Sequence, residues 1–171
     1  MTWTAPEIDR VGGSLVAGER EMLEGYLAWQ RSTLLHKCAG LTGDQLAERT
    51  VPPSGLSLLG LLRHLAKVER IWFRERFAGE QVERLHDTEH SKSADFAALD
   101  PTRAAEDYQR LVEECRLADA AVASASLDDT CTHGGEVYSL RLIYLHMITE
   151  YARHLGHADL LREQIDGVTG G

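Results

Sequence analysis

The sequence predicts an all-α protein, a single-domain four-helix bundle that extends over residues 1–171. Four segments repeat apolar residues at the three- and four-residue spacing of an amphipathic helix. Each segment is bounded by residues that typically begin or end helices. With 43% hydrophobic and 26% charged residues, the chain has the composition of a globular protein, and it is long enough to bury one core.

The first two predicted helices extend over about residues 18–39 and 57–78. The first ends before Gly40, a residue type that readily adopts the left-handed conformation found just after many helices. The second begins at Ser57, whose hydroxyl can accept a hydrogen bond from a free backbone N–H of the first turn. A turn and a short helix are expected between them, over residues 42–48.

The third and fourth predicted helices extend over about residues 101–124 and 139–166, with a loop between them. Asp100 and Pro101 indicate where the third begins, because Asp caps helices and proline is favoured at the first helical position. The connection of residues 80–99 is polar and has no periodicity. Its length is compatible with a crossover that returns the chain to the other end of the bundle.

Charge and composition exclude several classes of partner. The net charge of -9 and a pI near 5.3 argue against nucleic acid, because phosphate binding depends on Lys and Arg. No stretch has the length of a membrane span, and the N-terminus lacks the pattern of a signal peptide. Cys38, Cys115 and Cys131 are scattered and odd in number, as expected of reduced thiols. We therefore expect a cytoplasmic protein with neither a nucleic-acid nor a membrane partner.

The second predicted helix carries a histidine on its apolar face. The face assigned to the core carries Leu61, His64, Val68 and Ile71. The face assigned to solvent carries Arg63, Glu69, Arg70 and Arg74. His64 is thus a metal-competent side chain among apolar neighbours, although a lone histidine in such a place is more often a hydrogen-bonded core residue.

The fourth predicted helix carries a carboxylate in the middle of its apolar stripe. On a helical wheel of ~100° per residue, His146, His154 and His157 lie within about 40° of Glu150. An ionised carboxylate is costly to bury, so Glu150 needs a cation, a strong hydrogen-bond donor or a raised pKa. Pairing with Arg153 is one alternative to a metal ion.

Two helices therefore present metal-competent groups to the core. Three pairs on the fourth predicted helix have a spacing that lets both side chains reach one ion: His146/Glu150, Glu150/His154 and His154/His157. His64 from the facing helix would complete a three-ligand set and leave at least one position open. Spacing alone does not choose between the pairs. Two imidazoles and one carboxylate suit zinc, and nickel, iron or manganese are the other candidates.

Two segments resemble a known family. Residues 139–163 (SLRLIYLHMITEYARHLGHADLLRE) resemble the last helix of the DinB/YfiT-like (DinB) superfamily, and residues 57–70 (SLLGLLRHLAKVER) resemble its second helix. The likeness covers about residues 18–167. It is closest to an actinobacterial-type branch related to the mycothiol-dependent maleylpyruvate isomerases. The resemblance implies a four-helix bundle with up-down-down-up connectivity.

The resemblance also selects a ligand set. It implies one divalent metal held by His64, His154 and the residue four positions before His154. Many family members have histidine at that third position, whereas this chain has Glu150, as the maleylpyruvate isomerase branch does. His146 and His157 then become candidates for an outer layer that supports the ligands.

The activity that the resemblance implies is thiol chemistry. A low-molecular-weight thiol, mycothiol or bacillithiol, would attack an electrophile in an S-transfer or isomerisation. Arg153 or Arg63 would orient carboxylates of the thiol or substrate, the alternative for both being solvated surface charge. A metal-dependent hydrolase and a non-catalytic, metal-binding stress-response bundle are the competing hypotheses. Family members commonly dimerise, so a homodimer is expected.

Overall fold

The computed structural model describes residues 2–86 and 94–170. Four long helices dominate it: α1 (Glu19–Cys38), α3 (Leu58–Glu69), α4 (Ala104–Val122) and α5 (Leu140–Asp166). A π-helix, η1 (Arg70–Phe77), continues α3 without interruption. The all-α prediction is confirmed, and the helices lie where the periodicity places them.

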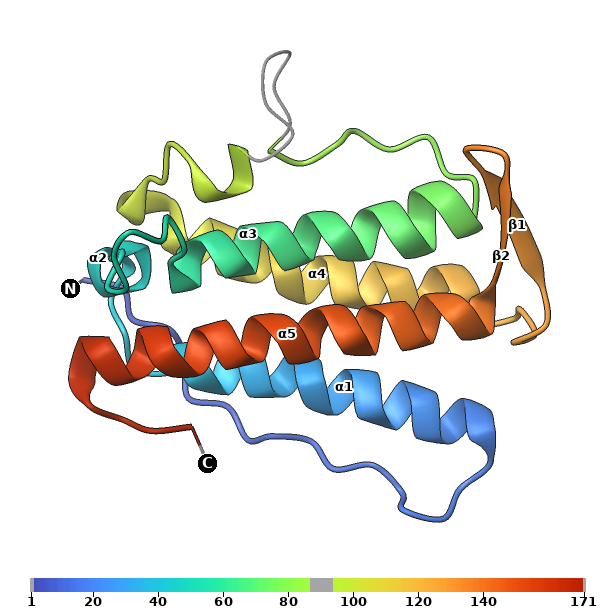
Figure 1. Ribbon diagram of the computed structural model, residues 1–171, viewed down its shortest axis with the longest axis horizontal. Helices are drawn as coiled ribbons and strands as arrows, with labels where there is room; N and C mark the ends of the chain where they lie inside the picture. Colours follow the sequence, from blue (N-terminus) through green and yellow to red (C-terminus); the bar gives the residue numbers. More distant parts are fainter. Residues whose placement is uncertain (1, 87–93, 171) are drawn as a thin grey trace.

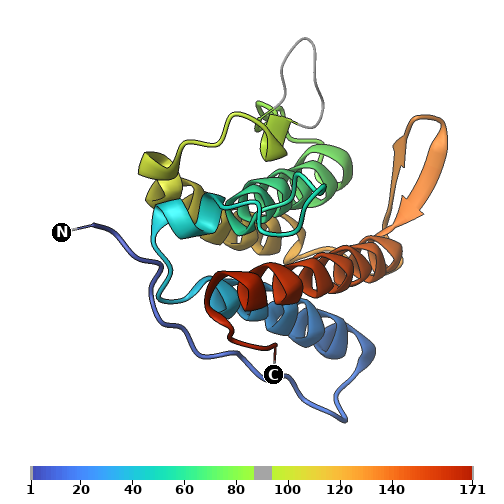
Figure 2. The same cartoon turned by 60° about the vertical axis from the view of Figure 1, so that its left-hand side comes forward.

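The four helices form a bundle with up-down-down-up connectivity (Figure 1). Helices α1 and α5 run in one direction and pack along each other, whereas α3 and α4 run in the opposite direction as a second pair. Figure 2 shows these two pairs stacked, with α3 also in contact with α5. The described parts of the long connection from η1 to α4 lie along the outside of α3, and they include two short 3-10 helices, η2 (Ala94–Phe96) and η3 (Pro101–Arg103).

The predicted start and stop signals act through hydrogen bonds and backbone conformation. The Ser57 hydroxyl accepts a hydrogen bond from the Gly60 N–H (3.1 Å), and the Ser139 hydroxyl accepts one from the Leu142 N–H (3.2 Å). Gly167 follows α5 with a φ of 80°, the left-handed conformation that glycine adopts without steric cost. The short helix between α1 and α3 is α2 (Gly43–Ala47).

A β-hairpin occupies the predicted loop between α4 and α5. Strands β1 (Thr130–His133) and β2 (Glu136–Ser139) pair antiparallel. Gly134 and Gly135 make its two-residue turn with φ values of 61° and 84°, which the turns of tight hairpins require. The strands are too short for their alternation to stand out in the sequence, so only the glycine pair signalled a turn.

Leucines fill the core at the level of α3. The side chains that are inaccessible to solvent include Leu34, Leu58, Leu59, Leu61, Leu62 and Leu65. Burial of such a side chain contributes about 1.5–3 kcal/mol, so these contacts hold the helices together. Within the described ranges, no helix is long and apolar enough to cross a bilayer, and the three cysteines form no disulfide.

The assignment of Glu69, Arg70 and Arg74 to a solvent face is wrong. Glu69 is 0% exposed and is bound by Arg31 of α1. Arg70 and Arg74 both bind Glu114 of α4, which is also 0% exposed. Charged residues paired across helices give the same sequence pattern as charged residues in water. For that reason the periodicity of one helix could not distinguish the two.

Candidate metal centre

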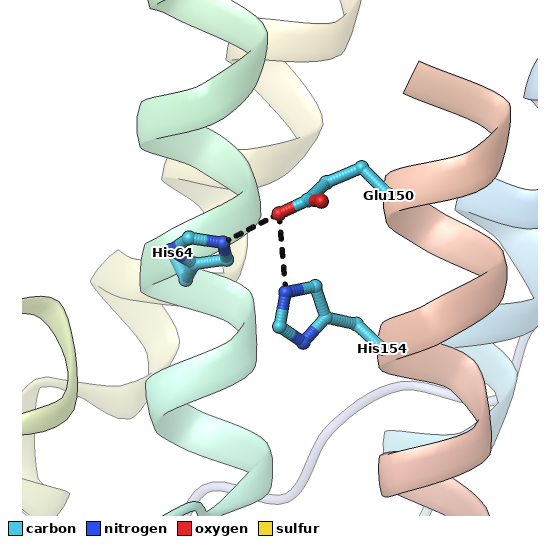
Figure 3. Close-up of side chains that lie close together, drawn as sticks. All are labelled: His64, Glu150 and His154. Carbon is cyan, nitrogen blue, oxygen red and sulfur yellow. Dashed lines mark hydrogen bonds and ion pairs between the residues drawn. The ribbon is translucent and has the colours of Figure 1, made fainter. Parts of the chain in front are cut away.

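Three side chains from two helices meet at one point (Figure 3). His64 of α3 reaches across to Glu150 and His154, which lie one turn apart on α5. The Glu150 Oε1 atom is 3.1 Å from His64 Nε2 and 3.2 Å from His154 Nε2. One donor atom of each residue lies within 4.8 Å of the other two. These are the three residues that the resemblance selected.

The cluster is partly open to solvent. The side chains of His64, Glu150 and His154 are 20%, 15% and 11% exposed. Buried side chains lie next to the ligands on both helices: Leu61 and Leu65 near His64 on α3, and Met147 and Tyr151 near Glu150 on α5. The ligands therefore lie at the rim of the core, where solvent reaches part of each side chain.

Asp95 supports His64 from the crossover connection, and sequence reasoning missed it. Its Oδ2 accepts a hydrogen bond from His64 Nδ1 at 2.7 Å, and the residue is only 2% exposed. Lys67 Nζ lies 3.7 Å from the other carboxylate oxygen. Asp95 lies in η2, inside a segment with no periodicity, so the sequence offered no signal that it faces α3.

The charges of the cluster shift two pKa values in opposite directions. Burial disfavours a charged His64, but hydrogen bonds with Asp95 and Glu150 outweigh it and raise the His64 pKa. Hydrogen bonds with His154 and His64 hold the pKa of Glu150 far below its usual range. In the metal-free protein the Glu150 carboxylate thus favours a positive charge on the His64 imidazole beside it.

The two other histidines of α5 lie in different surroundings. His157 Nδ1 is 3.3 Å from His154 Nδ1, so His157 lies behind a candidate ligand. Burial and the neighbouring His154 lower the pKa of His157. The His146 ring packs on Trp72, with ring centroids 4.2 Å apart. It is not part of the three-residue cluster.

The two arginines considered for ligand orientation also differ. Arg153 has a side chain that is 64% exposed, and its guanidinium lies 3.8 Å from Glu150 Oε2. It therefore borders the cluster from the solvent side. Arg63 points instead to the crossover connection, where it donates to the carbonyl oxygens of Ala94 and Ala98. Arg63 thus fastens the segment that carries Asp95.

The residues fit a divalent metal. At donor–metal distances of about 2.0–2.1 Å, two donors of a tetrahedral site lie about 3.3 Å apart. The separations from Glu150 Oε1 to the two imidazole nitrogens, 3.1 and 3.2 Å, are close to that value. Because Asp95 can only accept a hydrogen bond, it places a proton on His64 Nδ1 and leaves Nε2 as the nitrogen that faces Glu150. A proton on the imidazole bridges these two atoms in the metal-free protein, and a divalent cation could take its place.

One comparison with known proteins identifies the family of the chain. The model of the mycothiol-S-transferase family matches residues 22–167. The chain belongs to this family. The match also confirms the resemblance to DinB-like proteins. Searches of the curated proteins and of the solved structures found no match.

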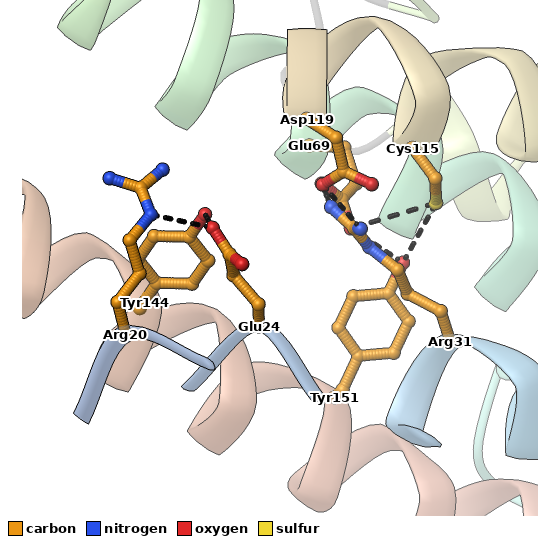
Figure 4. A network of polar contacts seen from close by, with 8 residues as sticks. All are labelled: Arg20, Glu24, Arg31, Glu69, Cys115, Asp119, Tyr144 and Tyr151. Atoms are coloured by element: carbon orange, nitrogen blue, oxygen red, sulfur yellow. Dashed lines mark hydrogen bonds and ion pairs between the residues drawn. The ribbon is translucent and has the colours of Figure 1, made fainter. Parts of the chain in front are cut away.

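In this mycothiol-S-transferase family member, a second polar network fixes the spacing of the helices that carry the ligands (Figure 4). Arg31 of α1 holds Glu69 of α3 through two bonds of 2.7 Å and Asp119 of α4 through one of 2.8 Å. Tyr151 of α5, the residue after Glu150, donates a hydrogen bond to the same Glu69 at 2.9 Å. The network joins all four long helices behind the metal ligands.

Proposed function

We propose that the chain is a metal-dependent thiol S-transferase that holds a divalent ion through His64, Glu150 and His154. Family membership supports the thiol chemistry. The single observation that carries the metal is the approach of two imidazole nitrogens to one carboxylate oxygen. Two imidazoles and a carboxylate are a ligand set of catalytic zinc sites, so zinc is the metal we propose, ahead of nickel, iron or manganese.

The proposed reaction joins a thiol sulfur to an electrophilic carbon. A divalent cation bound here would lower the pKa of a coordinated thiol. The thiol would release its proton to solvent, its sulfur would form the new C–S bond, and the bond from that carbon to the leaving group would break, the leaving group keeping the electron pair. Glu150 would offset part of the cation's charge, while Asp95 and His157 would orient the two imidazoles. The thiol we propose is mycothiol, with bacillithiol as the alternative.

A conjugation assay tests this proposal. Protein purified without a metal-affinity tag and loaded with zinc is mixed with mycothiol and monochlorobimane, whose conjugate fluoresces. We expect turnover with the wild type, none above background with His64→Ala, and wild-type turnover with Glu163→Gln, an exposed change on α5. Parallel reactions with bacillithiol and glutathione define the thiol. A zinc-loaded wild type that conjugates none of the three thiols with this or a maleylpyruvate-like electrophile would contradict the proposal.

We prefer the transferase to a hydrolase that uses a carboxylate as its general base. Such a hydrolase needs a carboxylate that is free to accept a proton from the metal-bound water. Glu150 contacts both candidate imidazole ligands, and Asp95 is bound to His64. The expected homodimer and the cytoplasmic location stay predictions.

A further inference from the structure

We propose that Asp95 is a positioning residue of the metal centre, which it prepares by fixing the tautomer and the ring orientation of His64. The inference rests on the proposed metal site and goes beyond it, because Asp95 lies outside the ligand set. It assigns a function to the crossover connection, which would otherwise only link η1 to α4.

The contact between Asp95 and His64 is short and buried, as expected of a residue that positions a metal ligand. Asp95 Oδ2 is 2.7 Å from His64 Nδ1, a short charge-assisted hydrogen bond, and Asp95 is almost completely buried. A carboxylate is only an acceptor, so His64 must carry its proton on Nδ1. The lone pair of Nε2, the atom that faces Glu150, is then available to a metal.

The surroundings hold Asp95 and the imidazole in place. Lys67 lies 3.7 Å from Asp95 Oδ1 and balances its charge. The Phe96 ring packs against the His64 ring with centroids 5.1 Å apart. Gly60 makes room for that ring, since a Cβ at this position would lie 2.7 Å from Phe96 Cδ1. The imidazole is therefore held at its edge by Asp95 and on its face by Phe96.

The other imidazole has a weaker support. His154 Nδ1 faces another imidazole nitrogen, His157 Nδ1, at 3.3 Å. Either nitrogen of that pair can carry the proton, so His157 does not impose a tautomer on His154. A carboxylate behind a metal-bound histidine also makes the ring a stronger donor. Of the two supporting residues, Asp95 and His157, Asp95 is thus the one that both fixes the tautomer of a histidine ligand and makes that histidine a stronger donor.

The test compares Asp95→Asn with Asp166→Asn. The control removes the same charge from a carboxylate that also makes a 2.8 Å ion pair, with Arg162, but at the last residue of α5, twelve residues beyond His154. Zinc affinity is measured by competition with a chromophoric chelator, and the ligand geometry by the visible spectrum of the cobalt-loaded protein. Loss of a residue that supports a metal ligand typically weakens metal binding 10–100-fold. We expect that loss and an altered cobalt spectrum for Asp95→Asn, and neither for Asp166→Asn.

The outcomes separate this inference from the proposed function. A wild type that binds zinc, with Asp95→Asn binding equally tightly and giving the same spectrum, overturns the role of Asp95 alone. A wild type that binds no zinc overturns both. Nitrogen-15 NMR of the wild type gives a check that needs no variant. Neutral His64 protonated at Nδ1 supports the inference, and protonation at Nε2 overturns it.

Discussion

At the scale of single residues, the site is organised around the Glu150 Oε1 atom, which contacts both His64 and His154. The sequence was sufficient to find these three residues. Periodicity placed polar groups on core faces, and the resemblance chose between the pairs on the last helix. Asp95 could not be found in that way, because its role depends on how a non-periodic connection folds back over α3.

Replacing Glu150 with Gln tests the charge of the cluster. The amide has nearly the same shape, but it is neutral and a much poorer ligand for a divalent cation. We expect the metal content to fall from about one equivalent to a small fraction of it, as measured by elemental analysis of protein purified without a metal-affinity tag. Glu163→Gln, the exposed change on the same helix, should keep its metal. Retention of a full equivalent by Glu150→Gln would exclude Glu150 as a ligand.

The opposite pKa shifts predict a pH dependence for the metal-free protein. The raised pKa of His64 contributes stability that is fully present below the unfolded value of about 6.5 and is lost as pH rises through the folded value. The lowered pKa of Glu150 contributes stability above its unfolded value of about 4.3. The combined contribution of His64 and Glu150 to the free energy of unfolding should thus be largest between about pH 4.3 and 6.5.

Bound zinc should stabilise the protein more at high pH than at low pH, because protons and metal compete for His64. The increase in melting temperature caused by zinc should therefore grow as pH rises from about 5.5 to 8, around the ordinary histidine pKa. Melting curves of both forms across this range measure it, with metal-free His64→Gln as the variant whose own pH dependence should be weaker. An effect of zinc that is the same at every pH would contradict the assignment of His64.

At the scale of elements, the sequence predicted each long helix from its apolar spacing, its capping serines and its terminal glycines. It failed where the structure depends on contacts between elements. Glu69 was assigned to solvent because nothing in its own helix reveals that Arg31 and Tyr151 meet it. The hairpin before α5 was missed because its strands are four residues each.

The Arg31 network makes a strong prediction about stability. Arg31→Met leaves the carboxylate of Glu69 buried without its counter-charge, which typically costs about 3–5 kcal/mol. Urea unfolding followed by circular dichroism measures the free energy. The double variant Arg31→Met/Glu69→Met should recover part of the loss, because no charge is then left unpaired. Arg116→Met, which breaks an exposed ion pair on α4, should change little. A loss for Arg31→Met no greater than for Arg116→Met would show that the network does not hold the helices.

At the scale of the whole molecule, the bundle places two kinds of polar cluster between its helix pairs. The ligands join α3 to α5 at a rim that solvent reaches, and the Arg31 network joins all four helices behind them. The leucine core surrounds α3 and does not depend on the ligands. The fold should therefore persist without metal, while metal adds stability.

Metal removal tests that division. With free zinc at about 100 times its dissociation constant, binding adds about 2.7 kcal/mol to the free energy of unfolding. For a domain of this size that corresponds to a rise in melting temperature of roughly 5–11 °C. A chelator should remove the rise while leaving the helical signal at 25 °C unchanged, and added zinc should restore it. Loss of helical structure on chelation would favour the non-catalytic hypothesis, in which the ion braces the helices.

The central claim is a metal centre shared by α3 and α5, and anomalous diffraction from crystals grown with zinc tests it most directly. We predict a single strong peak at the zinc edge between His64 Nε2, His154 Nε2 and the Glu150 carboxylate, at about 2.0–2.2 Å from each donor atom. Density without an anomalous peak, with the imidazoles still hydrogen-bonded directly to Glu150 at the present 3.1 and 3.2 Å, would contradict it.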